Sequence, residues 1–280
     1  ELEQGWGVGL LDGFRVFLRV DTIEIAAAFL LSLDPGRAHA LALSYQIYLK
    51  ENKKSVATIN RTLSSLSALV ALAQRVGLVA FELRLKAIPE ERFRDTRGPG
   101  HDGFVKMLAS LQNKTDIKSC RDRSLLRLLF DLALRRNEVL SLDREHLDME
   151  EGMAMVLGKG KTQRALMTLP LPTREALRAW LRHRGDQDGP LFHGFDPGRL
   201  SARLTGYGLY KIIRLLGQQV GVEVRPHGLR HAAITHALDK TNGDVRRVQK
   251  FSRHADLKTL CLYDDARHDV AGEIASLVSE

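Results

Sequence analysis

The sequence is poor in cysteine and in long apolar runs. Its 280 residues include two cysteines, Cys120 and Cys261, so a disulfide framework and a four-cysteine zinc site are both excluded. The most apolar stretch, residues 22–33, is shorter than the roughly 20 residues that a membrane helix needs, and it contains Glu24. No basic region with a small-residue cleavage site opens the chain. We therefore expect a soluble, intracellular protein without a membrane partner.

Acidic residues are fewer than basic ones, and the imbalance is local. The chain has 42 Lys+Arg against 34 Asp+Glu, a net charge of +8. Residues 1–35 carry two basic and six acidic side chains (net −4), whereas residues 36–94 carry ten basic and four acidic ones (net +6). A concentrated basic excess is typical of a nucleic-acid-binding surface. An ordinary solvated face is the alternative.

Helical periodicity dominates the N-terminal part. A capping box at Asp21 and Glu24 predicts a helix to about Leu33, and a second helix fits residues 37–50. A third runs over 55–76 and is closed by Gly77, with one apolar face at spacings of 4, 3 and 4: Ile59, Leu63, Leu66 and Val70. Arg61, Thr62, Ser64, Ser65 and Ser67 are predicted to lie largely off that face, where they could approach phosphates or be simply solvated.

An extended basic stretch then separates two helical domains. Residues 1–20 have no place that we can assign, residues 21–88 form the first predicted helical domain, 89–100 the linker and 101–280 the second domain. The second domain is predicted to contain two strands joined by a basic Gly-Lys loop, at 153–157 and 163–169. Its helices are expected at about 102–112, 119–135, 137–142, 173–183, 207–220, 228–239, 243–251 and 256–263.

Several side chains of the second domain are candidates for a catalytic role, although each alone has an ordinary structural explanation. Arg135 ends a predicted helix, Lys159 lies in the glycine-rich loop, and Tyr263 would ordinarily pack near the C-terminus. His227 and Arg230 are three residues apart, so a helix would place them on one face.

A metal site is a further alternative. His227 and His231 have the spacing of two ligands on one helix, but no H-E-x-x-H glutamate accompanies them. A zinc hydrolase using His227, His231 and His236 would also lack a carboxylate base, so we expect no metal.

In chain order these residues resemble the tyrosine recombinase (phage integrase) family, strongly over about 102–270 and more loosely over about 20–95. Residues 133–138 (ALRRNE) are similar to the family's G-L-R-x-x-E segment, and 158–161 with Arg164 to its hairpin. Residues 227–231 (HGLRH) match the H-x-L-R-H box. The final box is matched by Arg253, His254 and Tyr263. Ala133 and Arg253 depart from the family pattern, which has glycine at both positions.

The resemblance implies a mainly α fold with a small β-hairpin or sheet. A helical N-terminal core-binding domain would precede an α+β tyrosine-recombinase catalytic domain. It implies a site-specific, integrase-like recombinase that cuts and rejoins DNA through a 3′-phosphotyrosine and a Holliday junction, without metal or ATP. The implied catalytic residues are Tyr263 as nucleophile with Arg135, Arg230, His227, His254 and Lys159, and the supporting residues are Glu138 and His231. We predict DNA contacts from Arg61, Ser64, Ser65, Lys53, Lys54, Lys161 and Arg164.

The chemistry fits these residue types. A phosphodiester gains negative charge in its pentacoordinate state, and two guanidinium forks can stabilise that charge, with His254 as a further donor. Tyr263 has an ordinary pKa near 10, so His227 is the candidate proton acceptor, while Lys159 is the candidate acid for the leaving 5′-oxygen.

Partners follow from the same resemblance. We expect double-stranded DNA recombination sites, a homotetramer on DNA held by the C-terminal tail, room for an accessory DNA-bending protein, no cofactor and a cytoplasmic, nucleoid-associated location. The tail has an apolar stripe at Val270, Ile274, Leu277 and Val278 that could dock on a neighbouring protomer or on its own domain.

Two further readings stay open. A type IB topoisomerase-like enzyme would use the same chemistry to relax DNA as a monomer, and a DNA-binding protein on this scaffold would not react at all. Tyr207 and Tyr210 are fallback nucleophiles, which we expect instead to pack a helix.

Overall fold

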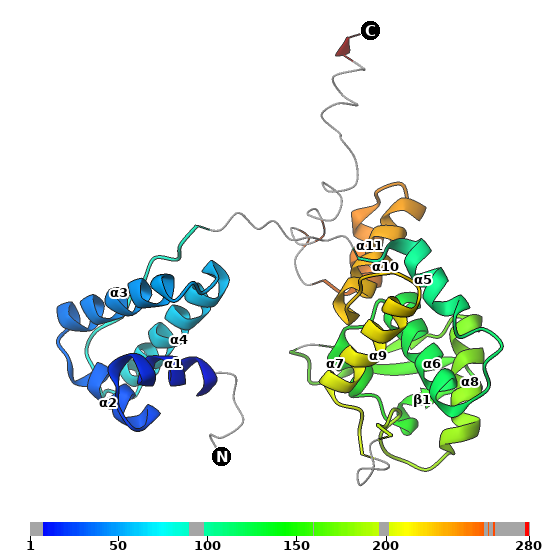
Figure 1. Ribbon diagram of the computed structural model, residues 1–280, viewed down its shortest axis with the longest axis horizontal. Helices are drawn as coiled ribbons and strands as arrows, with labels where there is room; N and C mark the ends of the chain where they lie inside the picture. The colour runs from blue at the N-terminus through cyan, green and yellow to red at the C-terminus, as the bar shows by residue number, and fades with distance from the viewer. Residues whose placement is uncertain are drawn as a thin grey trace. The chain divides into compact units, whose positions relative to one another are not determined.

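The structure, a computed structural model, describes residues 8–89, 98–158, 160–195 and 202–254, together with residues 257, 260, 278 and 279. The chain divides into two compact units, Glu1–Phe93 and Arg94–Glu280, the N-terminal unit and the C-terminal unit (Figure 1). Each unit has its own hydrophobic core. The predicted fold class, mainly α with a small antiparallel sheet, is confirmed.

The N-terminal unit is built from α1 (Val8–Leu18), α2 (Ile23–Ser32), α3 (Pro35–Glu51) and α4 (Val56–Arg75). Ser55 caps α4 by accepting the Thr58 N–H, and its apolar residues at spacings of 4, 3 and 4 all lie in the core, as predicted. Gly77, at φ +77°, ends the helix by letting the Leu78 N–H reach the Ala73 carbonyl.

Three expectations for the N-terminal unit were wrong or incomplete. The cap of α2 is Thr22, whose hydroxyl accepts the Ile25 N–H, because Thr22 lies one residue closer to the apolar run than Asp21. Thr62 is only 4% exposed and belongs to the buried side of α4. The unplaced first 20 residues contain α1, which contributes Phe14 to the core of the unit.

Helix α4 also bears on the membrane expectation. By length and composition it could cross a membrane, and it is the one helix in the described part of the chain that could. Its apolar character has a simpler explanation, since its apolar face packs in the core of the N-terminal unit.

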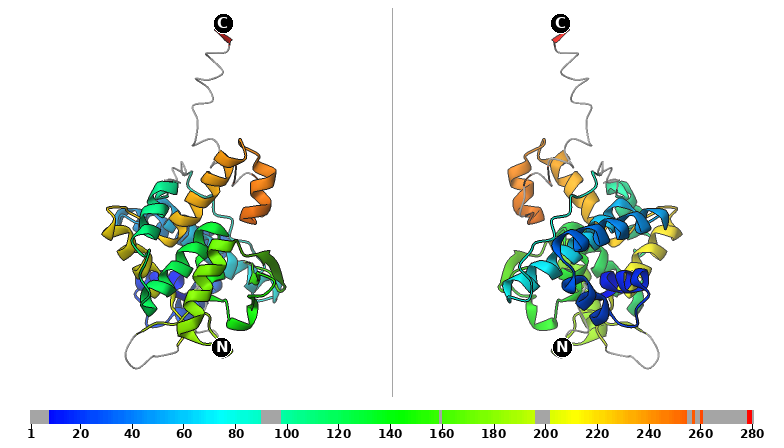
Figure 2. Two further views of the ribbon diagram at one scale, coloured as in Figure 1. Left: turned by 90° about the vertical axis from the view of Figure 1, so that its right-hand side faces the viewer. Right: turned by 90° about the vertical axis from the view of Figure 1, so that its left-hand side faces the viewer.

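In the C-terminal unit, α6 (Ile117–Asp131) is the central helix and packs against α5 (Gly100–Ala109), α8 (Leu171–Arg184) and α10 (Pro226–Lys240) (Figure 1). The other helices are α7 (Arg136–Leu140), the 3-10 turn η1 (Arg144–His146), α9 (Gly206–Gln219) and α11 (Val245–Ser252). Helices α10 and α11 pack together at one end of the unit (Figure 2).

A three-stranded antiparallel sheet lies beside these helices, in the order β1 (Leu147–Asp148), β2 (Met153–Leu157) and β3 (Arg164–Thr168). The two predicted strands form the β2–β3 hairpin, in a register that pairs Met153 with Thr168 and Leu157 with Arg164. Strand β1 was not predicted, because two residues are too few to show an alternating pattern.

The predicted helix 119–135 is too long. Helix α6 ends at Asp131, and Ala133 then takes a left-handed conformation, at φ +46°. Arg135 was predicted to end this helix. It stands instead at the N-cap position of α7. This change of direction sets up the candidate site.

Candidate active site

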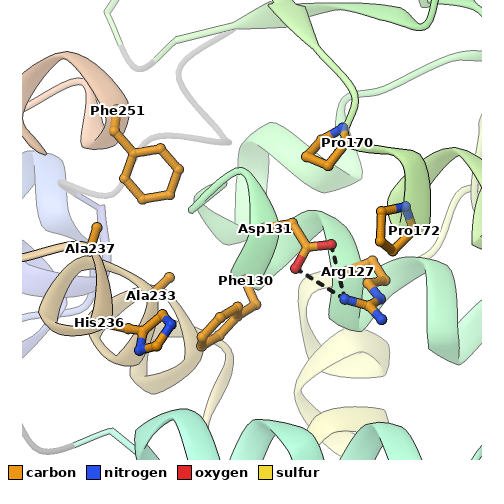
Figure 3. A pocket seen from close by; sticks show the side chains of 9 residues that line it. All are labelled: Arg127, Phe130, Asp131, Pro170, Pro172, Ala233, His236, Ala237 and Phe251. Atoms are coloured by element: carbon orange, nitrogen blue, oxygen red, sulfur yellow. Dashed lines mark hydrogen bonds and ion pairs between the residues drawn. The ribbon is translucent and has the colours of Figure 1, made fainter. Parts of the chain in front are cut away.

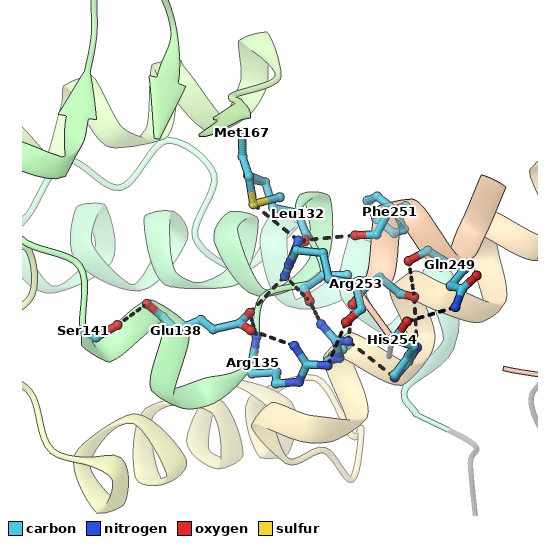
Figure 4. Close-up of polar contacts among 12 residues, drawn as sticks. Leu132, Arg135, Glu138, Ser141, Met167, Gln249, Phe251, Arg253 and His254 are labelled. Carbon is cyan, nitrogen blue, oxygen red and sulfur yellow. Dashed lines mark hydrogen bonds and ion pairs between the residues drawn. The ribbon is translucent and has the colours of Figure 1, made fainter. Parts of the chain in front are cut away.

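The turn between α6 and α7 presents Arg135 and holds it with Glu138. One carboxylate oxygen of Glu138 accepts the Arg135 backbone N–H at 2.9 Å, and the other accepts the Arg135 Nη1 at 2.7 Å (Figure 4). The Arg135 side chain is 27% exposed while that of Glu138 is 3% exposed. Arg135 thus remains open to a ligand, and its anchor is buried.

Glu138 has a second cationic partner, Arg253, which follows α11. The Arg253 Nη2 lies 2.9 Å from Glu138 Oε2. Burial on its own would raise the pKa of Glu138, but the hydrogen bonds from Arg135 and the charges of Arg253 and Arg135 outweigh it and hold that pKa below its ordinary value. Glu138 is therefore ionised at neutral pH.

Arg230 lies on α10, and only 1% of it is exposed. Its Nη1 donates to the Ala133 carbonyl and its Nη2 to the Ser252 carbonyl, so it joins the α6–α7 turn to the end of α11. The same Nη2 lies 3.4 Å from His254 Nε2. The structure therefore brings Arg135, Arg230 and His254 together, although they come from three separate segments.

His254 is held in the neutral state by its surroundings. Burial comes first, and electrostatic repulsion from Arg230, Arg135, His227 and Arg253 adds to it, lowering the pKa of His254 to about 4. Its Nδ1 lies 2.9 Å from the Ser252 hydroxyl, and Arg230 can only donate. In that arrangement Nε2 accepts from Arg230, and Nδ1 carries the proton toward Ser252.

His227 and His231 lie in the first turns of α10. Their rings meet edge to face, with centroids 4.3 Å apart, and His227 is exposed whereas His231 is 8% exposed. His227 is close enough to act electrostatically on His254. His236 lies elsewhere on α10 and stacks on His101 at 4.1 Å.

The two departures from the glycine pattern both fall on left-handed backbone. Ala133 has φ +46° and Arg253 has φ +55°, and such a conformation costs a residue with a Cβ on the order of 1 kcal/mol. Glycine would avoid that cost, so the backbone required at both positions is the one that glycine favours. The Ala133 carbonyl accepts from both Arg230 and, at 3.4 Å, Arg253.

Comparison with known proteins agrees with this geometry. The model of the phage integrase family matches residues 101–269. A tyrosine recombinase of Synechococcus elongatus is 36% identical over 266 residues, which cover 93% of this chain and 83% of that protein. The chain belongs to the phage integrase family. A tyrosine recombinase of Synechocystis sp. is likewise 36% identical, over 90% of this chain and 82% of its own length.

A solved structure shares the fold of this tyrosine recombinase. The XerH site-specific recombinase, bound to a palindromic difH substrate after cleavage, superposes with a TM-score of 0.69 at 19% identity, covering 96% of this chain and 80% of that one. The family resemblance, drawn from residues spread between positions 133 and 263, is therefore confirmed. The enzyme is a tyrosine-type site-specific recombinase.

Two of the six predicted catalytic residues of the recombinase, Tyr263 and Lys159, lie outside the described residues. So do the tail residues Val270, Ile274 and Leu277, while Val278 is described and is 81% exposed. Tyr207, one of the fallback nucleophiles, is 66% exposed, so the expectation that it packs a helix is wrong. The Tyr210 hydroxyl accepts from Arg214 Nη1 at 2.9 Å.

The predicted DNA contacts of the recombinase are mostly accessible. Exposed positions are Lys53, Lys54, Arg61, Ser64 and Lys161. The hydroxyls of Ser64 and Ser65 donate to the Asn60 and Arg61 carbonyls, so a phosphate would need other donors. Arg164 is half-buried at the start of β3, and its Nη1 has no hydrogen-bond partner among the described residues.

Three possible metal ligands do come together, at a place that the sequence did not indicate. Asp143, Glu145 and His146 lie around η1 with ligand atoms within 4.8 Å, the one such group among the described residues. Each already has a partner: Asp143 pairs with Arg203, Glu145 accepts the Gly189 N–H, and His146 Nδ1 accepts the Asp143 N–H. His227, His231 and His236 form no such group, which removes the geometric basis of the zinc hydrolase reading.

Proposed function

We propose that this recombinase cleaves and rejoins DNA through a covalent 3′-phosphotyrosine at Tyr263, by way of a Holliday junction, and needs neither a metal ion nor ATP. The observation that carries the proposal is the convergence of Arg135, Arg230 and His254 from three separate segments. A cluster of fixed donors of this kind suits a phosphate that gains charge during reaction.

Arg135 is the residue best suited to meet the scissile phosphate. Its side chain is partly exposed and is anchored on one edge by the buried Glu138. A guanidinium that is held in this way offers N–H donors without having to reorganise. In other enzymes the loss of one such donor costs about 2.7–4 kcal/mol of transition-state stabilisation.

Arg230 and His254 act as a pair in this proposal. A guanidinium has five N–H donors, so Arg230 does not have to break its bonds to the Ala133 and Ser252 carbonyls in order to bind a phosphate oxygen. For His254 to donate, its Nε2 must gain a proton, which the pKa of about 4 opposes before DNA binds. A bound phosphate adds negative charge next to both groups and favours that protonation.

The remaining steps involve Tyr263, His227 and Lys159. The Tyr263 oxygen attacks phosphorus as the bond to the 5′-oxygen breaks, giving a 3′-phosphotyrosine and a free 5′-hydroxyl. His227 takes the phenol proton, and Lys159 gives a proton to the leaving oxygen. At pH 7 a phenol of ordinary pKa costs about 4 kcal/mol to ionise, so removal of this proton needs a base. Because the new ester keeps the energy of the old one, rejoining needs no ATP.

A cavity in the C-terminal unit supports the proposed tetramer. It has a volume of about 300 Å³ and lies among α6, α8, α10 and α11, with apolar walls and the Arg127–Asp131 ion pair at one side (Figure 3). Such a cavity would accept apolar side chains of the C-terminal tail of a second copy, from the stripe that includes Val278. The proposal also includes double-stranded recombination sites bound by four protomers. It places the protein in the cytoplasm, associated with the nucleoid, and leaves room for an accessory DNA-bending protein.

Covalent capture on DNA tests the chemistry. Tagged enzyme is expressed in its source cells, the cells are denatured, and the DNA attached to the protein is sequenced, with Tyr263→Phe, Tyr207→Phe and Tyr210→Phe beside the wild type. We expect adducts at a few discrete sites in all but the Tyr263→Phe variant, and undiminished cleavage in EDTA with purified protein.

Other outcomes contradict the proposal in different ways. Adducts scattered over the genome would favour the topoisomerase-like alternative. Intact DNA binding without any adduct would favour a non-catalytic DNA-binding protein. Loss of cleavage in EDTA would show that a metal takes part.

A further inference from the structure

Arg253 is outside the proposed catalytic set, yet its guanidinium makes several contacts at the edge of the site. Its Nη2 pairs with Glu138 at 2.9 Å and donates to the Ala133 carbonyl at 3.4 Å. Its Nη1 donates to the Leu132 and Phe251 carbonyls at 3.2 and 3.3 Å and lies 3.3 Å from the Met167 sulfur (Figure 4). One side chain therefore joins the ends of α6 and α11 and strand β3.

These contacts act on Arg135 by two routes. Arg253 holds the Glu138 carboxylate whose two oxygens bind the Arg135 backbone and side chain. The Arg253 carbonyl also accepts from Arg135 Nη2 at 3.3 Å. Arg135 is thus held at Nη1 by Glu138 and at Nη2 by the Arg253 backbone, while its side chain stays 27% exposed.

The conformation of Arg253 argues against an incidental surface arginine. It caps α11 with φ +55° and ψ +39°, a left-handed geometry that is costly for any residue with a Cβ. Its side chain is only 19% exposed, and burial lowers its pKa although the neighbouring Glu138 favours its charge. Both costs oppose an arginine here, so its contacts with Glu138 and the three carbonyls must outweigh them.

We propose that Arg253 is a positioning residue, which fixes Arg135 toward the scissile phosphate by holding Glu138. The inference rests on the proposed role of Arg135 as a phosphate ligand. In this chain the buried Arg253–Glu138 ion pair stands where the family pattern has an unstrained glycine. The orientation of the Arg135 side chain depends on that pair.

The test compares Arg253→Gly with Arg19→Gly on the full chain. Arg19 is also an arginine in left-handed backbone, at φ +58°, but it is exposed and lies at the end of α1. Both variants relieve the same backbone cost, so they separate that effect from the loss of the guanidinium contacts. The measurements are single-turnover cleavage of a nicked suicide substrate at saturating enzyme, DNA affinity and melting temperature.

We expect Arg253→Gly to cleave more slowly than wild type by about tenfold to a hundredfold, because a misplaced catalytic group is costly. Its DNA affinity should stay within about twofold, since positioning affects chemistry more than binding. Arg19→Gly should cleave at the wild-type rate. Arg253→Lys should recover part of the rate, because an ammonium keeps the charge beside Glu138 but not the fork.

A double variant separates positioning from plain stabilisation. In a Glu138→Gln background, the added Arg253→Gly change should slow cleavage by less than about threefold, because the route through Glu138 is already weakened. Independent, multiplying effects of the two changes would overturn the proposal, and so would a wild-type rate in Arg253→Gly. If Arg253→Gly does not fold, an unchanged rate in Arg253→Lys would overturn it instead.

A crystal structure of Arg253→Gly, or of Arg253→Lys where the glycine variant fails to fold, gives a readout that does not depend on cleavage. The proposal expects the Arg135–Glu138 side-chain pair to be displaced, and a retained pair overturns it. Absence of any Tyr263 adduct in the wild type would reject the proposed function while leaving this structural test in force.

Discussion

In the described part of the N-terminal unit the buried side chains are apolar or aromatic apart from Thr62, whereas the C-terminal unit buries charged groups beside its candidate site. Among the described residues, the buried acidic and basic side chains of the C-terminal unit are Arg121, Glu138, Arg230 and His231. An apolar core needs no particular partner for each side chain, but a buried charge does. The C-terminal unit therefore depends on specific pairs, and changes that break single pairs should affect the two units differently.

Glu138→Ala should have the largest effect on stability. It leaves Arg135 and Arg253 without their common carboxylate, and removal of one partner from a buried ion pair typically costs about 3–5 kcal/mol. The expected result is a loss of that order in the unfolding free energy of the C-terminal unit. Because the units can unfold separately, hydrogen exchange in denaturant, read unit by unit, is the appropriate measurement.

An exposed ion pair supplies the control for this prediction. Arg84 and Glu82 are 2.6 Å apart, about as close as Arg135 and Glu138, but their side chains are 83% and 48% exposed. Glu82→Ala should change stability by less than about 0.5 kcal/mol. Equal losses in the two variants would contradict the view that burial makes the difference.

Arg135→Lys should have the next largest effect, on chemistry. A lysine keeps the charge but not the planar fork, so we expect cleavage to slow by about 10²–10³, equivalent to about 2.7–4 kcal/mol, with little change in DNA affinity. Arg136→Lys, at the exposed neighbouring position, is the matched control and should cleave normally. A fall in DNA affinity without slower single-turnover cleavage would assign Arg135 to binding alone.

Acid should weaken the C-terminal unit partly through His254. Its folded pKa of about 4 lies below the ordinary value of 6.5, so the unfolded chain binds a proton first as the pH falls. The stability that depends on neutral His254 is complete above about pH 6.5 and is lost toward pH 4. Between pH 7 and pH 5, hydrogen exchange should show that the C-terminal unit loses less stability in His254→Gln than in wild type.

Wild type and His254→Gln differ only at position 254, so the titration of every other group contributes equally to both proteins. His146, His193 and His236 also have lowered pKa values, each first through burial, and they remain in both proteins. Burial raises the pKa of Asp122 and Asp131, which act in the opposite direction and also cancel. Identical slopes for His254→Gln and wild type would mean that His254 is not held neutral.

Local patterns predicted the elements well, and the gaps in that prediction have a physical cause. Strand β2 was predicted to the residue and α4 to within one residue at each end, because periodicity, caps and Gly77 are properties of neighbouring residues. The end of α6 was missed, because nothing adjacent to Ala133 indicates a left-handed alanine. The Ala133 carbonyl accepts there from Arg230 and Arg253, which lie 97 and 120 positions further along the chain, and these contacts hold that turn.

The site was predicted in the same uneven way. The order of motifs identified Arg135, Arg230 and His254, and the fold brings them together. Arg253 entered the prediction only as a departure from a glycine pattern, although it pairs with Glu138 across 115 positions of the chain. No spacing rule reports a contact of that kind. A charged residue at a position that favours left-handed backbone is the one local feature that points to it.

Tyr45→Phe should give the smallest effect, with the opposite sign. The Tyr45 hydroxyl is buried among Phe14, Phe17 and Tyr48, and no described group hydrogen-bonds to it, while burial raises its pKa to about 12. The ring fits because Gly13 lies against it, where a Cβ would come within 2.7 Å of the hydroxyl oxygen. Removing an unsatisfied buried hydroxyl should stabilise the N-terminal unit by about 1 kcal/mol.

Tyr48→Phe is the control for this last prediction, because Tyr48 belongs to the same aromatic group but is only half-buried. It should leave the hydrogen-exchange protection of the N-terminal unit nearly unchanged. If Tyr45→Phe destabilises the unit by as much as a broken ion pair does, the hydroxyl has a partner in solution. The N-terminal core would then depend on a specific polar contact, as the core of the C-terminal unit does, and the contrast between the two units would be lost.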